Sequence, residues 1–312
     1  MILDALISPK QAEKKPWVMI FVGFIYAAIA MPVAYFIDKS YSSMIMVLLT
    51  VIAAMPFIYN VIKLEEKKDE NYTSERKLLK EHSKAVMAFL FLFVGISFAF
   101  AMGAIFLPEE VNDNLFSAQH ETIRSINAPH SLEESYEGST NESQRDPGHI
   151  VGQCRARDFS DNFNIFLGYI SHNFIVLVLA LIFSFIYGLG AIYIIVWNAS
   201  ILGYAIGVFV TTQLANLAST GGLQAYFQSF SCGFFVRYLP HGLIEIMAYL
   251  VAGLAGAIIS VAIVRHTFGT KKFTRVIADS VNLIAIAIVL LIIAAFVEAF
   301  ITIDVLCVWL CE

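Results

Sequence analysis

The chain has 312 residues, of which 58% are hydrophobic and only 14% are charged, and its formal net charge is −5. Soluble domains are closer to half apolar and one quarter charged, so this composition excludes an ordinary soluble enzyme or binding domain. The negative balance and the lack of a basic, aromatic patch argue against nucleic acid as a partner.

Seven uninterrupted apolar runs are long enough to cross about 30 Å of hydrocarbon. Their hydropathy does not alternate, so they predict helices rather than a barrel. The expected fold is therefore all-α: a multi-pass protein of the cell membrane, surrounded by the lipid bilayer. The runs cover 17–37, 42–63, 86–107, 164–187, 190–212, 239–264 and 281–303.

The short connection between the fourth and fifth runs leaves the geometry of these two runs open. The fourth and fifth runs are separated only by Gly188-Leu189-Gly190, which predicts either a tight turn between full spans or a pair of half-helices.

With the N-terminus inside, the inner segments carry 14 Lys and Arg residues and the outer segments carry 6. This bias predicts the N-terminus inside and the C-terminus outside. The first run is soon followed by a second, so we interpret it as an anchor and not as a cleavable signal.

The runs divide the chain into three regions. Residues 1–63 form an N-terminal transmembrane hairpin, and residues 64–85 form a charged cytoplasmic linker. The linker is expected to extend the flanking helices, with its charges on a solvated face. Residues 86–305 form the membrane core.

The predicted outer side carries two polar segments and all four cysteines. The loop 108–163 holds eleven acidic residues against four arginines. Its part 127–148 is expected to be mobile, and contact with an envelope partner is the alternative. Segment 213–238 is rich in aromatic residues, which predicts an interfacial or re-entrant helix. Two disulfides or four free thiols both remain open, and without a CxxC spacing a metal site is not indicated. The cysteines are Cys154, Cys232, Cys307 and Cys311.

A histidine and a carboxylate lie at the start of the sixth run, in Leu239-Pro240-His241-Gly242-Leu243-Ile244-Glu245. Ionisable side chains in hydrocarbon are rare and usually functional. Pro240 suits the first helical position, and His241 and Glu245 would share one helix face. Three roles remain open: a metal site with His172 as a further ligand, an acid–base or proton-relay pair, and a structural pair that joins helices. The HExxH signature of zinc proteases is absent.

Other polar residues in or near the runs are expected to support this pair. Arg237 is placed to neutralise Glu245, and Glu298 is expected to join a polar cluster with Arg237 or His241. Buried amides in a bilayer need partners, so Asn173 and Asn198 are expected to bridge helices.

Two runs carry small residues at helical spacing, which allows helices to approach closely. The stripes predict tight helix packing and, through exposed small-residue faces, a homodimer. They consist of Ala199, Gly203 and Gly207 in the fifth run, and of Ala248, Ala252 and Gly256 beside Gly253 in the sixth.

Taken together, these motifs resemble the stage II sporulation protein M family over roughly residues 85–305. The most specific part is Leu239-Pro240-His241-Gly242 with Glu245, followed by Ala252-Gly253 and Gly256. The resemblance also rests on Asn173, Gly188, Gly190, Asn198, Gly203 and Gly207. Where the family often has Asn-Gly, this chain has Asn198-Ala199. The resemblance implies an integral membrane protein, which in spore formers looks like a scaffold that positions cell-wall hydrolases during engulfment.

The expected function is therefore a non-enzymatic membrane scaffold or assembly protein of the cell envelope. The first alternative is a transporter or channel, in which His172, His241, Glu245 and Glu298 bind ions or relay protons. The second is an intramembrane metal-dependent hydrolase that uses His241 and Glu245. No phosphate-binding loop, nucleophile elbow or haem motif is present, so the sequence indicates no particular cofactor or metal.

Overall fold

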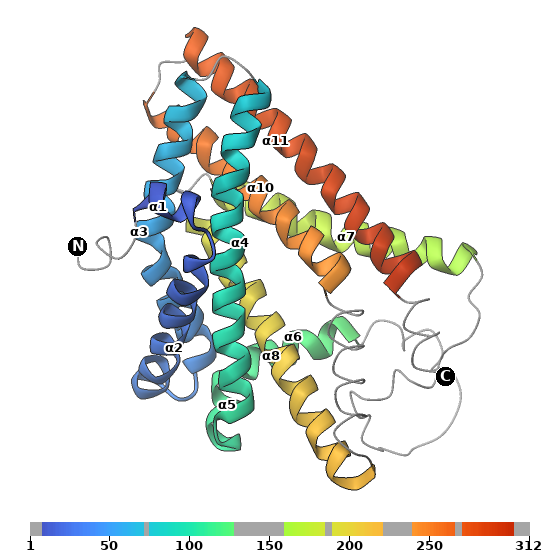
Figure 1. Ribbon diagram of the computed structural model, residues 1–312. Coiled ribbons are helices and arrows are strands. Elements are labelled where there is room, and N and C mark those ends of the chain that lie inside the picture. Colours follow the sequence, from blue (N-terminus) through green and yellow to red (C-terminus); the bar gives the residue numbers. More distant parts are fainter. Residues whose placement is uncertain are drawn as a thin grey trace.

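The computed structural model describes residues 8–71, 75–127, 159–184, 189–220, 239–265 and 270–302, and the elements in these ranges are helices. Figure 1 shows them as a bundle in which the long α4 runs from one end to the other. The helices are α1 (Pro9–Lys14), α2 (Val18–Ile37), α3 (Ser42–Asn71), α4 (Glu75–Phe106), α5 (Glu109–Leu115), α6 (Ser117–Asn127), α7 (Phe159–Ser184), α8 (Leu189–Thr220), α10 (Leu239–Arg265), α11 (Lys271–Phe296) and the π-helix η5 (Val297–Thr302).

The prediction of seven membrane spans is confirmed. In the described part of the chain, seven helices are long and apolar enough to cross a membrane, namely α2, α3, α4, α7, α8, α10 and α11 with η5. The spans of α7 and α8 contain 23 and 21 residues, so each is long enough to cross alone. Their lengths favour two full spans over the alternative of two half-helices.

The charged segment 64–85 differs from its expected solvated state. Helix α3 continues to Asn71 and α4 begins at Glu75, so most of this segment prolongs the two spans. Glu65, Glu66 and His82 are buried, with exposed fractions of 0, 1 and 2%. The physical reason is the short helix α1, which packs against both α3 and α4 at this end.

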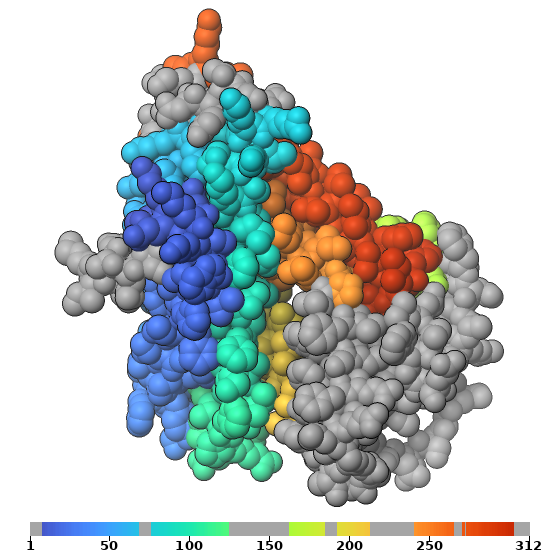
Figure 2. Space-filling view, in the orientation of Figure 1, coloured from blue at the N-terminus to red at the C-terminus, as the bar shows by residue number. Residues whose placement is uncertain are grey.

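Helices α4 and α10 form the centre of the bundle, and most of each span is buried. Helix α4 packs against α2 and α8, whereas α10 packs against α11 and α7. Figure 1 shows α7 and α11 crossing the long axis of α4 obliquely, and Figure 2 shows the N-terminal helices lying along α4. The buried residues form one apolar core that extends through these helices.

The beginning of the polar loop predicted at 108–163 is helical and packs on the bundle. Phe116, between α5 and α6, stacks on Tyr204 of α8 with ring centroids 5.1 Å apart, and meets Phe100 of α4 edge-on. Two aromatic contacts therefore fix α5 and α6 against the core. The part predicted to be mobile, apart from residue 127, and the aromatic segment from 221 onward lie outside the described residues.

Candidate functional site

The face of α10 that carries His241 and Glu245 continues with Tyr249, one helical step further. The Tyr249 hydroxyl donates a hydrogen bond to Glu245 Oε1 at 2.6 Å. Tyr249 is almost fully buried, and a short bond to a carboxyl oxygen is among the stronger kinds of hydrogen bond. Glu245 thus has a partner within its own helix, so it does not depend on His241.

His241 contacts the π-helix η5 instead. Its Nδ1 lies 3.3 Å from Thr302 Oγ1, and its Nε2 lies 3.8 Å from Glu298 Oε1. The second distance is too long for a hydrogen bond, so Glu298 acts on His241 mainly through its charge. The side chains of His241 and Glu298 are 13% and 20% exposed, so this contact is mostly shielded by protein.

The π-helix η5 contains both partners of His241, Glu298 and Thr302. Thr302 Oγ1 donates to the carbonyl of Val297, five residues earlier, at 3.1 Å. Such π-segments are rare and often lie at functional sites. We define the polar cluster as His241, Glu245, Tyr249, Glu298 and Thr302. Sequence patterns identified three of its members but not Tyr249 or Thr302, although the four-residue spacing from Glu245 to Tyr249 is a usable signal.

The remaining predicted polar residues are spread over the molecule. His172 is exposed on α7. Asn198 donates its amide to the Ile194 carbonyl of its own helix at 2.8 Å, so the expectation that this bond bridges helices is wrong. Asn173 is buried on α7. Arg237 and the cysteines, Cys154, Cys232, Cys307 and Cys311, lie outside the described residues.

The described part of the chain gathers no group of three or more His, Cys, Asp or Glu side chains that would hold a metal ion. The metal hypothesis needed at least one further ligand beside His241 and Glu245, with His172 as the candidate, and His172 does not join them in such a group.

The glycines of the small-residue stripes lie where helices approach each other closely. A Cβ atom added at Gly203 would lie 2.5 Å from the Ser97 carbonyl oxygen of α4, and one at Gly256 would lie 2.8 Å from the Leu181 carbonyl oxygen of α7. Gly207 similarly faces Ala104 of α4. At Gly242, in contrast, no described residue lies within 4 Å of an added Cβ atom.

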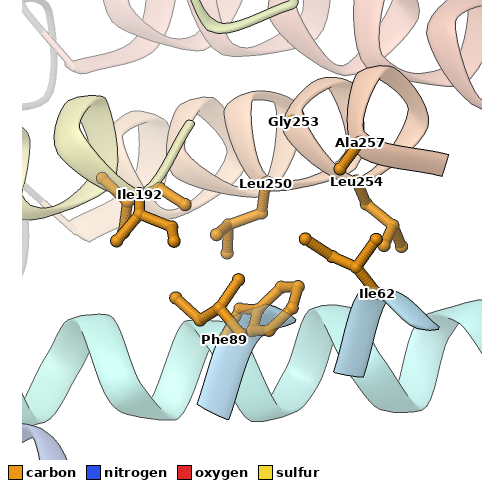
Figure 3. A pocket seen from close by; sticks show the side chains of 9 residues that line it. Ile62, Phe89, Ile192, Leu250, Gly253, Leu254 and Ala257 are labelled. Carbon is orange, nitrogen blue, oxygen red and sulfur yellow. The ribbon is translucent and has the colours of Figure 1, made fainter. Parts of the chain in front are cut away.

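A small apolar cavity of about 10 Å³ separates α10 from α3, α4 and α8. Figure 3 shows Leu250 and Leu254 of α10 facing Ile62 and Phe89, with Ile192 of α8 beside Leu250. Ala252, also on α10, is fully buried. The volume is close to that of a single water site, and the apolar lining offers a water no polar partners.

A second polar contact between helices was not predicted. Gln119 of α6 accepts a hydrogen bond from Ser43 of α3 at 2.7 Å and donates one to Ser200 of α8 at 3.0 Å. All three side chains are at most 1% exposed. Gln119 belongs to a segment that was expected to be a polar loop, so only the packed structure identifies it as a buried connection between three helices.

The helical spans and their buried polar contacts define a multi-pass α-helical membrane protein. More particularly, the chain belongs to the stage II sporulation protein M family, whose sequence profile matches residues 17–303. It is 29% identical over 147 residues to an uncharacterized protein of Methanocaldococcus jannaschii, a match that covers 46% of this chain and 58% of that relative. The chain thus aligns with little more than half the length of this relative. No solved structure matches the chain.

Proposed function

We propose that the protein is a non-enzymatic membrane scaffold of the cell envelope. The observation that carries the proposal is that polar side chains form hydrogen bonds between helices. Gln119 joins α3, α6 and α8, and His241 joins α10 to η5. Hydrogen bonds between spans hold helices in one arrangement, as a rigid assembly platform requires.

A transporter or channel is the second candidate, and one observation favours it. His241 and Glu298 are ionisable side chains within membrane spans, they lie 3.8 Å apart, and they meet at a π-helix. Such intramembrane pairs often mark proton or ion paths. Envelope partners and a homodimer belong to the scaffold proposal, in which exposed faces of the spans would hold other proteins.

Proton flux distinguishes the two candidates. The purified full chain is placed in lipid vesicles that contain a pH-sensitive dye, and a pH step is applied. A scaffold gives the same slow dye response as protein-free vesicles, and Glu298→Gln changes only thermal stability. A response in the wild type that Glu298→Gln abolishes at unchanged stability rejects the scaffold. Glu110→Gln is the matched control, since Glu110 is exposed outside the spans.

The scaffold also has a positive readout. Residue-specific cross-linking in the native membrane is expected to yield one envelope protein in stoichiometric amounts. The same adduct should form in Glu298→Gln at equal protein levels, because binding would not depend on proton transfer. Absence of any stoichiometric adduct, together with absence of flux, counts against the scaffold and leaves the family membership intact.

A further inference from the structure

The end of the bundle where α1 meets α3 and α4 contains ionisable groups that the proposed function does not use. Lys68 is their centre: its Nζ lies 2.9 Å from Glu13 Oε2, 2.7 Å from Glu65 Oε1 and 3.5 Å from Glu81 Oε2. Glu65 Oε2 lies 2.7 Å from His82 Nδ1. Glu13 comes from α1, Glu65 and Lys68 from α3, and Glu81 and His82 from α4, so these groups join three helices.

The charges of this group do not balance at face value. Three carboxylates surround the single ammonium of Lys68. Glu81 has a further cation, Lys84, at 2.5 Å, and Glu65 faces His82, which is charged only when protonated. With a neutral His82, the three carboxylates exceed the two ammonium groups by one. The side chains of Glu13 and Glu65 are only 9% and 0% exposed, so water screens their repulsion poorly. Two carboxylates that share one buried site cannot both remain ionised without a large cost. One bound proton relieves that cost.

The hydrogen bonds indicate which carboxyl group carries the proton. Both oxygens of Glu65 face a donor group, Lys68 for Oε1 and His82 for Oε2. Glu13 Oε2 accepts from Lys68, but Glu13 Oε1 is buried and receives no hydrogen bond. Between two ionised carboxylates no donor exists. A proton on Glu13 Oε1 would create one and would give this atom a hydrogen bond to the neighbouring Glu65 carboxylate.

We propose that Glu13 Oε1 binds a proton shared with Glu65, and that this proton fastens α1 to the end of α3 and α4. The ligand is the proton itself, since the Lys68 ammonium already occupies the position that a metal cation would take. When the proton leaves, the ionised Glu13 faces Glu65 and α1 detaches. Lys10 and Lys14 of α1 lie on either side of Glu13 in the sequence, and Lys84 faces Glu81. The inference is independent of whether the protein is a scaffold or a transporter.

Burial, followed by the hydrogen bond and charge of Glu65, raises the pKa of Glu13 to about 7 from 4.5, against the opposing effect of Lys68. A group whose pKa is raised in the docked state favours docking fully below its undocked pKa and loses that effect as pH rises through the docked pKa. From these two pKa values, the docking constant falls about tenfold between about pH 6 and about pH 8.

Hydrogen exchange of the full chain in lipid nanodiscs measures this directly. After correction for the intrinsic exchange rate at each pH, the protection of the α1 amides is expected to fall about tenfold between about pH 6 and about pH 8. Protection within α10, far from Glu13, serves as the internal standard. Infrared difference spectra across the same pH step should show the C=O stretch of a protonated carboxyl group disappearing.

The variant Glu13→Gln removes the titratable proton but keeps the hydrogen bonds to Lys68 and Glu65. Its amide keeps an acceptor for Lys68 and a fixed donor for Glu65, so α1 should stay protected at both pH values and the infrared band should vanish. Glu81→Gln is the matched control, because it also removes a carboxylate beside Lys68 but should leave the pH dependence intact. If Glu13→Gln keeps the wild-type pH dependence, or exposes α1 at both pH values, the proposal is overturned.

Discussion

The contact between Gly203 of α8 and α4 allows a sharp test of the packing. In Gly203→Ala the new Cβ would lie 2.5 Å from the Ser97 carbonyl oxygen, 2.8 Å from Phe100 Cβ and 3.1 Å from the Ala101 nitrogen. Two of these atoms belong to the backbone, which cannot rotate away as a flexible side chain can. Helices α4 and α8 must therefore separate along this contact, and neighbouring apolar side chains lose part of their packing.

The expected cost combines two opposing terms. Overpacking a close contact typically costs about 1–3 kcal/mol. Replacing glycine with alanine inside a helix contributes about 1 kcal/mol in the opposite direction. The net effect is then a loss of stability of up to about 2 kcal/mol. Gly168→Ala on α7 is the matched control, because nothing lies within 4 Å of its added Cβ. That variant should gain up to about 1 kcal/mol from helix propensity alone.

Both variants can be compared in detergent micelles by reversible denaturation, with tryptophan fluorescence as the signal. Gly203→Ala should be the less stable of the two, and the gap between them should equal the overpacking cost of about 1–3 kcal/mol. Identical shifts in Gly203→Ala and Gly168→Ala would refute the argument, since the two share the helix-propensity term and differ only in the α4 contact.

Two further variants test the polar contacts. Tyr249→Phe removes the donor to Glu245 and should lower stability by about 1–3 kcal/mol in the same denaturation assay, because a buried carboxyl group loses its bond. Gln119→Leu should cost a similar amount, about 1–3 kcal/mol, because the buried Ser43 hydroxyl loses its acceptor and the Ser200 oxygen loses a donor. It should also increase hydrogen exchange in α6.

Each of these two variants has a control on a nearby exposed group. Tyr193→Phe changes an exposed ring on α8, and Ser117→Ala removes an exposed hydroxyl on α6. Both should stay within about 0.5 kcal/mol of the wild type. If Tyr249→Phe behaves like Tyr193→Phe, the hydroxyl of Tyr249 does not stabilise the site. If Gln119→Leu behaves like Ser117→Ala, the hydrogen bonds of Gln119 do not stabilise the packing of α6.

The seven spans could be predicted because each depends on a local property. A run of about 20 apolar residues must be helical in hydrocarbon, whatever lies beside it. The sequence also placed His241 and Glu245 on one helix face, since the four-residue spacing is itself a property of the helix. The orientation of the chain stays a prediction from the distribution of Lys and Arg.

The partners of the polar side chains could not be predicted in this way. Asn198 satisfies its amide within α8, and His241 finds Thr302, which lies 61 positions away in the sequence. The local pattern at Asn198 is equally compatible with a bond to its own helix or to another. A choice between them depends on which helix packs alongside, and hydropathy does not specify that.

Hydropathy and residue spacing alone therefore determined that this chain has seven helices able to span a membrane. They did not fix every helix start, since α4 and α11 begin at Glu75 and Lys271, before the predicted starts at 86 and 281. Only the packed structure decided whether a charged residue is solvated. Glu65 and His82 lie in a sequence that looks like an exposed linker, yet both are buried because α1 packs against α3 and α4. Burial is a property of the neighbours that surround a side chain, and those neighbours are brought together by tertiary packing.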